Sequence, residues 1–437
     1  MQTFFDSALE AEFNKIYEKL KKLERKNDDE YQSDLSFLLE HFRIFEPLDT
    51  TCQREDFSVS AIDGSGASDL IKLNNISVHL ITAGFSADQT DFKKGTTTEL
   101  DIRPEISTYP NGVTKLVLIR EDEELEVWEE ITNFVRENYG KEPKEIVFDV
   151  LRTMILRKME NEGKDISKIR IKNTFELLHQ AKLAGFTLYN KPLEKFHEWM
   201  ISPRPQTGWY DQFREILEYS LAFSILKTNK KIKYLFIDGS MNMLISKNHN
   251  QPRLISNYLL RDLCTEALKR DTCVVAVSKT TTFPFIYKIA QDVRNHLKGE
   301  KKWFFRVPSK ELGETPLRLL EGKSIPPENA ITYLFHFSAD LPVLRIDFDL
   351  DWWKKNIHSE DKEKEKEREV EMFKEIDWLS RDVRYHGYLF DLAFSHFNAL
   401  ITFKERDLIA DRLIDFFTEK GEDPRRYIHP RKRLGLM

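Results

Sequence analysis

The chain has 437 residues, 41% of them hydrophobic and 32% charged, so it can bury a large core as one elaborated domain or as two or three smaller ones. Its 67 lysines and arginines against 73 aspartates and glutamates leave a net charge of −6, which identifies no partner. A nucleic-acid-binding protein of this composition must concentrate its basic side chains locally. The basic stretches are Lys279, residues 298–306 and residues 424–433, although a run of charge most often only faces solvent.

The sequence argues against membrane attachment and disulfide bonding. No run approaches the roughly 18 consecutive apolar residues that a membrane span needs, and the first residues, MQTFFDSALEAEFNK, are acidic where a signal peptide would be basic. The three cysteines, Cys52, Cys264 and Cys273, are too few and too scattered for a zinc site or a disulfide framework. We therefore expect a cytoplasmic protein with buried thiols and no membrane contact.

The first part of the chain predicts helices followed by strands. Apolar residues recur at helical spacing over residues 5–46, with a polar break, and predict an N-terminal helical hairpin within residues 1–50. Runs rich in β-branched residues at 57–68, 71–85 and 113–121 then predict a meander of antiparallel strands. Residues 123–230 return to helical spacing and predict a large helical insertion.

The second half predicts a crossover unit and further strands. Strand patterns at 233–241 and 271–280 flank a helical stretch, an order that fits a parallel strand–helix–strand crossover. A strand pair is predicted at 330–338 and 341–349, an exposed charged helix within 360–387, and helices at 388–402 and 405–417. The expected fold is a mixed α/β sheet flanked by helices, ordered as in ribonuclease-H-like proteins, within one domain over residues 55–437.

The tetrapeptide Ile-Asp-Gly-Ser occurs twice, around Asp63 and around Asp238, each time after an apolar run that predicts a strand. One copy alone is most simply a turn, because Asp-Gly is a common turn sequence. If the two strands are neighbours, their carboxyl ends place two carboxylates together at the edge of the sheet, where open α/β sheets bind ligands.

Paired carboxylates suit the hydrolysis of phosphodiesters. Two divalent metal ions bridged by shared carboxylates can activate a water molecule and stabilise the charge that develops on phosphorus and on the leaving oxygen. Oxygen ligands favour Mg²⁺ or Mn²⁺ over zinc. The glycine after each aspartate would let a phosphate backbone approach closely. These features predict a metal-dependent phosphodiesterase that uses Asp63 and Asp238.

At these motifs the chain resembles the NurA nucleases, which act beside the HerA translocase. The resemblance implies metal ligands at Asp63, Glu218, Asp238 and His396, and supporting roles for Tyr388 and Lys279. Glu218 follows Arg214 by four residues, as in the family's helix motif, and Glu215 is the competing choice. Tyr388 and His396 stand eight residues apart as the family's Tyr and His do, but the intervening residues differ and lack the prolines often found there.

Structural roles compete with each of these assignments. A histidine on the apolar face of a helix is more often a packed core residue, a tyrosine can simply pack in the core, and Glu218 can be a solvated carboxylate. Asp347, Asp349 and Asp351 alternate, so they share one face of a strand. They could bind metal, but a solvent-facing edge strand is the more usual explanation.

The resemblance also implies how the protein works. It implies digestion of DNA ends with 5′ to 3′ polarity, nicking of single strands, a homodimer and docking on a HerA-type hexameric translocase, in break repair or in defence against foreign DNA. The alternative is an inert subunit that binds nucleic acid or regulates a translocase; retention of every acidic position disfavours it, because a carboxylate cluster without metal repels itself and DNA. An NTPase is excluded by the lack of a GxxxxGK[ST] loop.

Overall fold

The structure of the protein is a computed structural model. It describes residues 13, 15–19, 41–48, 54–73, 76–120, 124–188, 191–192, 209–228, 230–241, 255–278, 286, 301–315, 327, 329–338, 342–385 and 387–423. No helix within these ranges is both long enough and apolar enough to cross a membrane.

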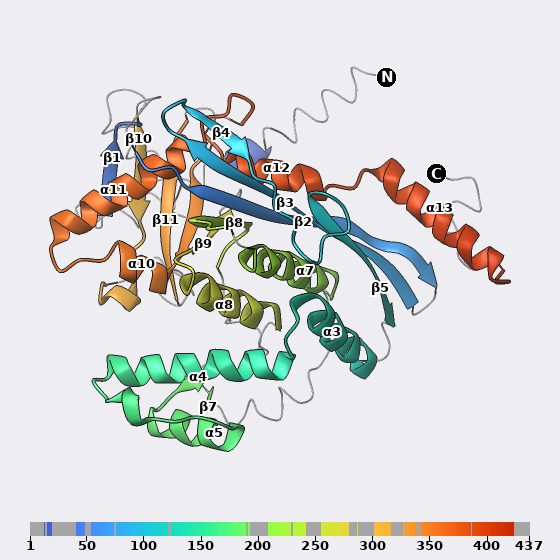
Figure 1. The fold of residues 1–437 in the computed structure, drawn as a ribbon, viewed down its shortest axis with the longest axis horizontal. Helices are drawn as coiled ribbons and strands as arrows, with labels where there is room; N and C mark the ends of the chain where they lie inside the picture. The colour runs from blue at the N-terminus through green and yellow to red at the C-terminus, as the bar shows by residue number, and fades with distance from the viewer. Residues whose placement is uncertain are drawn as a thin grey trace.

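The described strands form one ten-stranded mixed sheet, together with a small separate pair (Figure 1). Its order is β1-β10-β11-β12-β9-β8-β2-β3-β4, with β5 also paired to β3. The bounds are β1 (Phe42–Phe45), β2 (Ser58–Leu73), β3 (Ile76–Asp91), β4 (Thr96–Glu99), β5 (Gly112–Arg120), β8 (Tyr234–Asp238), β9 (Cys273–Ser278), β10 (Lys302–Arg306), β11 (Ala330–His336) and β12 (Leu344–Asp349), and the pair is β6 (Thr187–Leu188) with β7 (Lys191–Pro192).

Pairing within the sheet confirms the main sequence predictions. β2, β3 and β5 form the predicted antiparallel meander, and β11 and β12 form the predicted antiparallel pair. β8 and β9 are parallel and are connected through α8 (Ile255–Leu268), which is the predicted crossover. β2 and β8 are also parallel, so the strands that carry the two Ile-Asp-Gly-Ser copies lie side by side. The mixed sheet flanked by helices is therefore confirmed as the fold class.

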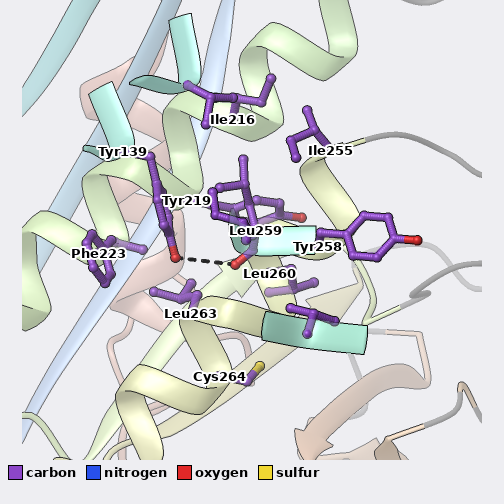
Figure 2. Close-up of a cluster of buried hydrophobic side chains, with 14 of the residues drawn as sticks. Tyr139, Ile216, Tyr219, Phe223, Ile255, Tyr258, Leu259, Leu260, Leu263 and Cys264 are labelled. Carbon is purple, nitrogen blue, oxygen red and sulfur yellow. Dashed lines mark hydrogen bonds between the residues drawn. The ribbon is translucent and has the colours of Figure 1, made fainter. Parts of the chain in front are cut away.

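Helices cover both faces of this sheet, each over its own hydrophobic core (Figure 1). Figure 2 shows the core where α3, α7 and α8 meet: Tyr139 stacks on Phe223 at 4.4 Å between ring centroids, and its hydroxyl donates to the Leu259 carbonyl at 3.5 Å. The first face carries α3 (Glu124–Tyr139), α7 (Trp209–Leu226) and α8, and α4 (Pro143–Asn161) and α5 (Thr174–Leu183) pack outside this layer. The second face carries α10 (Leu350–Asn356), α11 (Lys362–Trp378) and α12 (Phe390–Ala399), and α13 (Phe403–Glu419) follows α12.

The predicted helical insertion is mostly helical, but its last helix belongs to the core of the fold. Phe213, Ile216 and Leu217 of α7 are all 0% exposed, and α7 packs directly on β2 and β3. α4 instead packs on α8, and α5 packs on α4. The insertion that stands away from the sheet is therefore the α4–α5 unit.

Part of the predicted N-terminal hairpin is a strand. Phe42–Phe45 forms β1 and pairs antiparallel with β10, because its aromatic side chains pack against Trp303 and Phe304. Residues 13 and 15–19 are helical as predicted, and the rest of the hairpin lies outside the described residues.

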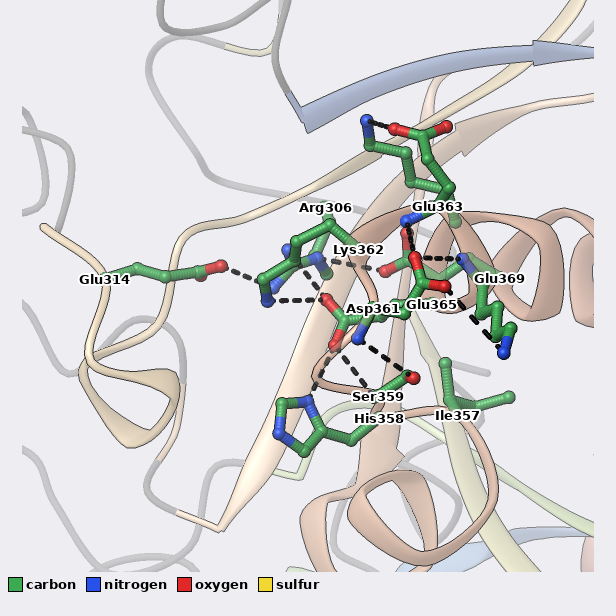
Figure 3. Close-up of polar contacts among 12 residues, drawn as sticks. Arg306, Glu314, Ile357, His358, Ser359, Asp361, Lys362, Glu363, Glu365 and Glu369 are labelled. Carbon is green, nitrogen blue, oxygen red and sulfur yellow. Dashed lines mark hydrogen bonds and ion pairs between the residues drawn. The ribbon is translucent and has the colours of Figure 1, made fainter.

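The basic stretch at 298–306 does not form a surface patch where it is described. Residues 302–306 are strand β10, and Arg306 is 7% exposed. Its guanidinium forms ion pairs with Glu314 at 2.8 Å and with Glu369 at 2.9 Å, as Figure 3 shows. Both glutamates neutralise Arg306 inside the fold. Lys279 and the basic stretch 424–433 lie outside the described residues.

Helix α11 is amphipathic rather than wholly exposed. Met372, Phe373 and Ile376 are buried against the second face of the sheet, and Phe373 stacks on Phe304 at 4.0 Å. Charged side chains of its first turns also turn inward, because Glu365 and Glu369 meet Arg306 (Figure 3). The charge run therefore contributes ion pairs to the interior as well as a solvated surface.

The alternating aspartates near residue 350 lie inside the sheet, which corrects the edge-strand prediction. β12 lies between β11 and β9, and Asp347 and Asp349 are 0% and 1% exposed. Asp351 is not in the strand, since it lies in the first turn of α10. Side-chain partners on neighbouring elements make this burial possible.

Candidate active site

The two repeated motifs lie in register on adjacent parallel strands. Ile62 of β2 pairs with Ile237 of β8, so Asp63 and Asp238 are the next residues on each strand. β8 ends at Asp238, whereas β2 continues to Leu73. Asp63 therefore lies in the middle of its strand, not at the predicted strand end, and it is 3% exposed. The carboxylates meet where β8 stops alongside β2.

Glu218 reaches this point from α7. A Cβ atom added to Gly64 would lie 2.0 Å from Glu218 Oε1 and 2.8 Å from Arg214 Cγ, so the glutamate occupies the space that glycine leaves. The space beside the glycine after Asp63 is therefore filled by a carboxylate of the protein itself. The sequence predicted instead that a phosphate backbone would approach at this glycine. Glu218 is 6% exposed, and Arg214 Nε lies 3.7 Å from its Oε1.

Helix α12 is held against β3, directly opposite Asp63. Gly84 pairs with Asp63, and a Cβ atom at Gly84 would lie 2.5 Å from the Ala399 nitrogen. Thr82 donates to the Ala399 carbonyl at 2.6 Å and Asn398 donates to the Phe85 carbonyl at 2.9 Å. Glycine is required at position 84 because the helix backbone lies on the strand.

This close packing brings His396 to Asp63. His396 Nδ1 lies 2.7 Å from Asp63 Oδ2, and the His396 side chain is 45% exposed while that of Asp63 is 4% exposed. A carboxylate oxygen accepts hydrogen bonds, so this contact favours the imidazole tautomer that carries its proton on Nδ1 and leaves Nε2 available to a ligand. The histidine is thus oriented by a buried carboxylate with part of its ring open to solvent.

Tyr388 lies close to both aspartates. Burial raises the pKa of the Tyr388 hydroxyl well above its usual range, and the charges of Asp238 and Asp63 raise it further. The ring packs against the core of the second sheet face. Tyr388 therefore stays a neutral hydroxyl beside the carboxylates, and it combines the core-packing role with a position in the site.

The carboxylates strongly affect one another. Burial raises the pKa of Glu218 well above its usual range; Arg214 opposes this shift, whereas Asp63, Glu215 and Asp238 add to it. The residues that the sequence placed together, Asp63, Glu218, Asp238, Tyr388 and His396, thus lie in one cluster. Their donor atoms are mostly carboxylate oxygens, a set that fits a hard divalent cation. Within the described residues, however, no three Asp, Glu, His or Cys side chains are arranged to hold a metal ion at once.

Sequence reasoning missed two features of the site. The first is Gly84, whose isolated place in a β-branched strand is the sequence signal for a close backbone approach. The second is the ion pair of Arg214 with Glu218, which their spacing of four residues on a helix indicates. Lys279 follows β9 and lies outside the described residues, so its predicted role stays a prediction.

Comparisons with known proteins give structural neighbours only. No protein-family model and no curated protein matches the sequence. Among solved structures, the chain is similar to the NurA nuclease from Sulfolobus solfataricus, with 13% identity over 97% of this chain and 99% of that one and a TM-score of 0.42. It is also similar to NurA bound to dAMP and manganese, with 12% identity over 92% of this chain and 95% of that one and a TM-score of 0.35. The similarity spans nearly the whole chain.

Proposed function

We propose that this chain is a divalent-metal-dependent deoxyribonuclease that hydrolyses phosphodiester bonds. One observation carries the proposal: Asp63 and Asp238 are in register at the point where β8 ends, and Glu218 and His396 converge on them from opposite faces of the sheet. Asp63, Glu215 and Asp238 each add to the raised pKa of Glu218, because like charges disfavour its ionised form. A divalent cation bound among these carboxylates would relieve that repulsion.

Asp63, Glu218, Asp238 and the Nε2 atom of His396 would hold Mn²⁺ or Mg²⁺. Bound there, two such ions would activate water and neutralise charge on the scissile phosphate. The carboxylates would be ionised in the metal-bound protein, because a cation favours the charged form. The low exposure of Asp63 and Glu218 would limit competition by solvent for the same ligands.

The remaining polar groups would orient the substrate and move protons. Asp63 fixes the ring of His396, so in the alternative to metal binding a protonated Nε2 on the exposed edge of the ring would deliver a proton to the leaving oxygen. Tyr388, kept neutral beside Asp238, could donate its hydroxyl to a phosphate oxygen or to the attacking water. Lys279 would neutralise phosphate charge.

The biological setting is proposed from the resemblance of the motifs to those of NurA nucleases. DNA is the proposed substrate, attacked from 5′ ends and nicked within single strands. The proposed partners are a second copy of the chain and a HerA-type hexameric translocase that feeds DNA to the site during break repair or antiviral defence.

The test is cleavage of end-labelled linear duplex and single-stranded DNA by the purified protein with Mn²⁺, with Mg²⁺ or with EDTA. We expect products that require a metal and that disappear in Asp63→Asn, whose side chain is nearly isosteric and loses only the charge. Circular dichroism of Asp63→Asn is the control for folding. If the folded variant cleaves at the wild-type rate, the proposed site is wrong, and if wild type cleaves equally well in EDTA, metal dependence is wrong.

A further inference from the structure

Three residues lie in a row across β5, β3 and β2. Gly112 pairs with Gly84, and Gly84 pairs with Asp63, so all three positions face the same side of the sheet. Neither glycine has a side chain, so two of the three positions leave room above the sheet for other groups. At Gly84 the backbone of α12 fills this room, because an added Cβ atom would lie 2.6 Å from the Ser395 carbonyl oxygen.

A turn before β5 places Tyr109 over the outer glycine of this row. The segment Tyr109-Pro110-Asn111-Gly112 contains residue types that favour turns, and backbone hydrogen bonds of 3.2 and 3.3 Å between Tyr109 and Gly112 close it. The Phe85 N–H donates to the Asn111 carbonyl at 2.9 Å, which fixes the turn to β3. A Cβ atom added to Gly112 would overlap the Tyr109 hydroxyl oxygen, so the phenol fills the space above Gly112.

The Tyr109 hydroxyl connects β3 with the end of α12. It donates to the Asn398 carbonyl at 2.9 Å and lies 3.4 Å from the Ala83 carbonyl oxygen. Burial raises the pKa of Tyr109 to about 12, so the hydroxyl keeps its proton throughout the neutral pH range. Asn398 follows His396 by two residues on α12, and Ala83 is on β3. One phenol therefore contacts both the strand and the helix turn that carries His396.

Two further hydrogen bonds hold the same turn of α12. The last carbonyls of a helix have no partner within it, so groups from other elements have to supply one. The Asn398 carbonyl accepts from Tyr109, and the Ala399 carbonyl accepts from Thr82 at 2.6 Å. The Asn398 amide in turn donates to the Phe85 carbonyl at 2.9 Å. These three hydrogen bonds, donated by Tyr109, Thr82 and Asn398, form a clamp on the end of α12.

We propose that Tyr109 is a positioning residue for His396. The His396 side chain is 45% exposed and its Nδ1 lies 2.7 Å from Asp63 Oδ2, so the placement of the helix turn decides whether this short distance is kept. A shift of that turn along β3 has to break the clamp first. The inference rests on the proposed function and deepens it, because Tyr109 would fix the geometry of a residue that binds metal or transfers a proton.

The first test observes His396 without requiring cleavage. Full-length protein with ¹⁵N-labelled histidine is studied by NMR in EDTA, at a pH where the ring is neutral, and His396→Gln identifies the His396 signals. The ¹⁵N shifts of the ring report which nitrogen carries the proton. We expect wild type to carry it on Nδ1. Tyr109→Phe removes only the hydroxyl and should shift the signals toward a mixture of tautomers, and Asn398→Ala should shift them in the same direction.

The second test separates positioning from DNA binding. Under single-turnover conditions in Mn²⁺, Tyr109→Phe should lower the cleavage rate at saturating DNA by about tenfold, because misplacing a reacting group by about 1 Å costs up to about 100-fold. The DNA concentration that gives half the maximal rate should change less than about twofold, because Tyr109 positions His396 and does not bind DNA. Combining Tyr109→Phe with Asn398→Ala should cost less than the product of the two single effects, because both act on one helix turn.

Tyr333→Phe is the matched control for lost stability. Tyr333 is 0% exposed and its hydroxyl donates to Glu369 at 2.6 Å, whereas Tyr109 is half-buried. Its strand β11 is separated from β2 by β12, β9 and β8. Tyr333→Phe should therefore lower the midpoint of urea unfolding at least as much as Tyr109→Phe does, and it should leave both the His396 signals and the cleavage rate unchanged.

Two results would overturn the positioning role: unchanged His396 signals in folded Tyr109→Phe, or an equal fall in cleavage rate in the Tyr109 and Tyr333 variants. These results are distinct from failure of the proposed function. If wild type cleaves DNA but Tyr109→Phe changes neither the His396 signals nor the rate, only the positioning role is wrong. If Tyr109→Phe shifts the His396 signals but no metal supports cleavage by wild type, only the nuclease is wrong.

Discussion

Two groups of buried carboxylates lie in this sheet, and they differ in what faces them. In the group around β12, Asp349 receives a hydrogen bond from Arg261 Nη1 at 2.7 Å and Asp351 receives one from Arg261 Nη2 at 2.5 Å. Asp347 meets Arg345 at 2.7 Å and accepts from Thr332 at 2.7 Å. Each of these carboxylates has an arginine in direct contact, so the group is an internal ion-pair network.

The group at the end of β8 is arranged differently. Asp63 and Asp238 raise the pKa of Glu218, and the arginine beside Glu218 stands at 3.7 Å. Neighbouring carboxylates repel one another and lower stability, so this arrangement is more typical of a ligand-binding site. A structural ion-pair network instead places opposite charges together. The distance from each buried carboxylate to an arginine therefore distinguishes the candidate site from the structural ion-pair network.

The largest expected effect is on stability, from Arg261→Met. This change leaves the buried Asp349 without its guanidinium partner, whereas the partly exposed Asp351 keeps Arg157, and it should lower the free energy of unfolding by about 3–5 kcal/mol. Urea unfolding measures it. Arg270→Met is the control, because Arg270 is partly exposed and its ion pair with Glu266 spans 3.7 Å, so it should cost under about 1 kcal/mol. An equal decrease in the free energy of unfolding in the two variants would mean that the ion pairs around β12 do not stabilise the fold.

The sequence predicts much of the strand arrangement, but it does not predict which cations lie next to each buried carboxylate. Repetition of Ile-Asp-Gly-Ser after two apolar runs predicts Asp63 beside Asp238 if the two strands are neighbours, and β2 and β8 are parallel neighbours. The sequence allows Asp349 to bind metal but favours a solvent-facing edge strand, and it does not reveal the partner of Asp349, because Arg261 lies 88 residues away on α8. An ion pair between residues far apart in the chain leaves no local sequence pattern.

Local conformation explains the other differences. The strand β1 was missed because its aromatic residues match a helical spacing, and tertiary pairing with β10 decided its conformation. His396 was predicted from its spacing with Tyr388, but its contact with Asp63 depends on Gly84 letting α12 lie on β3. The choice between Glu218 and Glu215 depends on which face of α7 meets the sheet, which spacing alone left open.

The next largest effect is on cleavage, from Glu218→Gln compared with Glu215→Gln. Glu218 lies against Gly64 within the site, so loss of its charge should lower the rate of DNA cleavage by about 100-fold, equivalent to about 2.7 kcal/mol. Glu215 is only half-buried and should change the rate less than about threefold. Cleavage under single-turnover conditions with Mn²⁺ measures both. The reverse order would move the ligand assignment to Glu215.

The smallest expected effect is the pH dependence that Glu218 confers on stability in EDTA. Its folded-state pKa is raised well above the usual range, so the folded protein holds a proton that the unfolded chain releases above its ordinary value of 4.5. The free energy of unfolding should therefore fall as pH rises from that value through the raised pKa, by at most about 1.4 kcal/mol per pH unit. Below pH 4.5 both states are protonated and this contribution is constant.

Glu218→Gln isolates that contribution, because glutamine stays neutral at every pH. Urea unfolding at a series of pH values should show the variant gaining stability over wild type as pH rises, and Arg270→Met should keep the wild-type slope because Arg270 is exposed and pairs with Glu266 rather than with Glu218. In saturating Mn²⁺, the stability of wild type alone should rise with pH. The cation binds the ionised carboxylate, so proton release accompanies metal binding. If the free energies of unfolding of wild type and Glu218→Gln change with pH in parallel, the negative charges at β8 are neutralised as fully as those at β12. The two groups of carboxylates would then not differ.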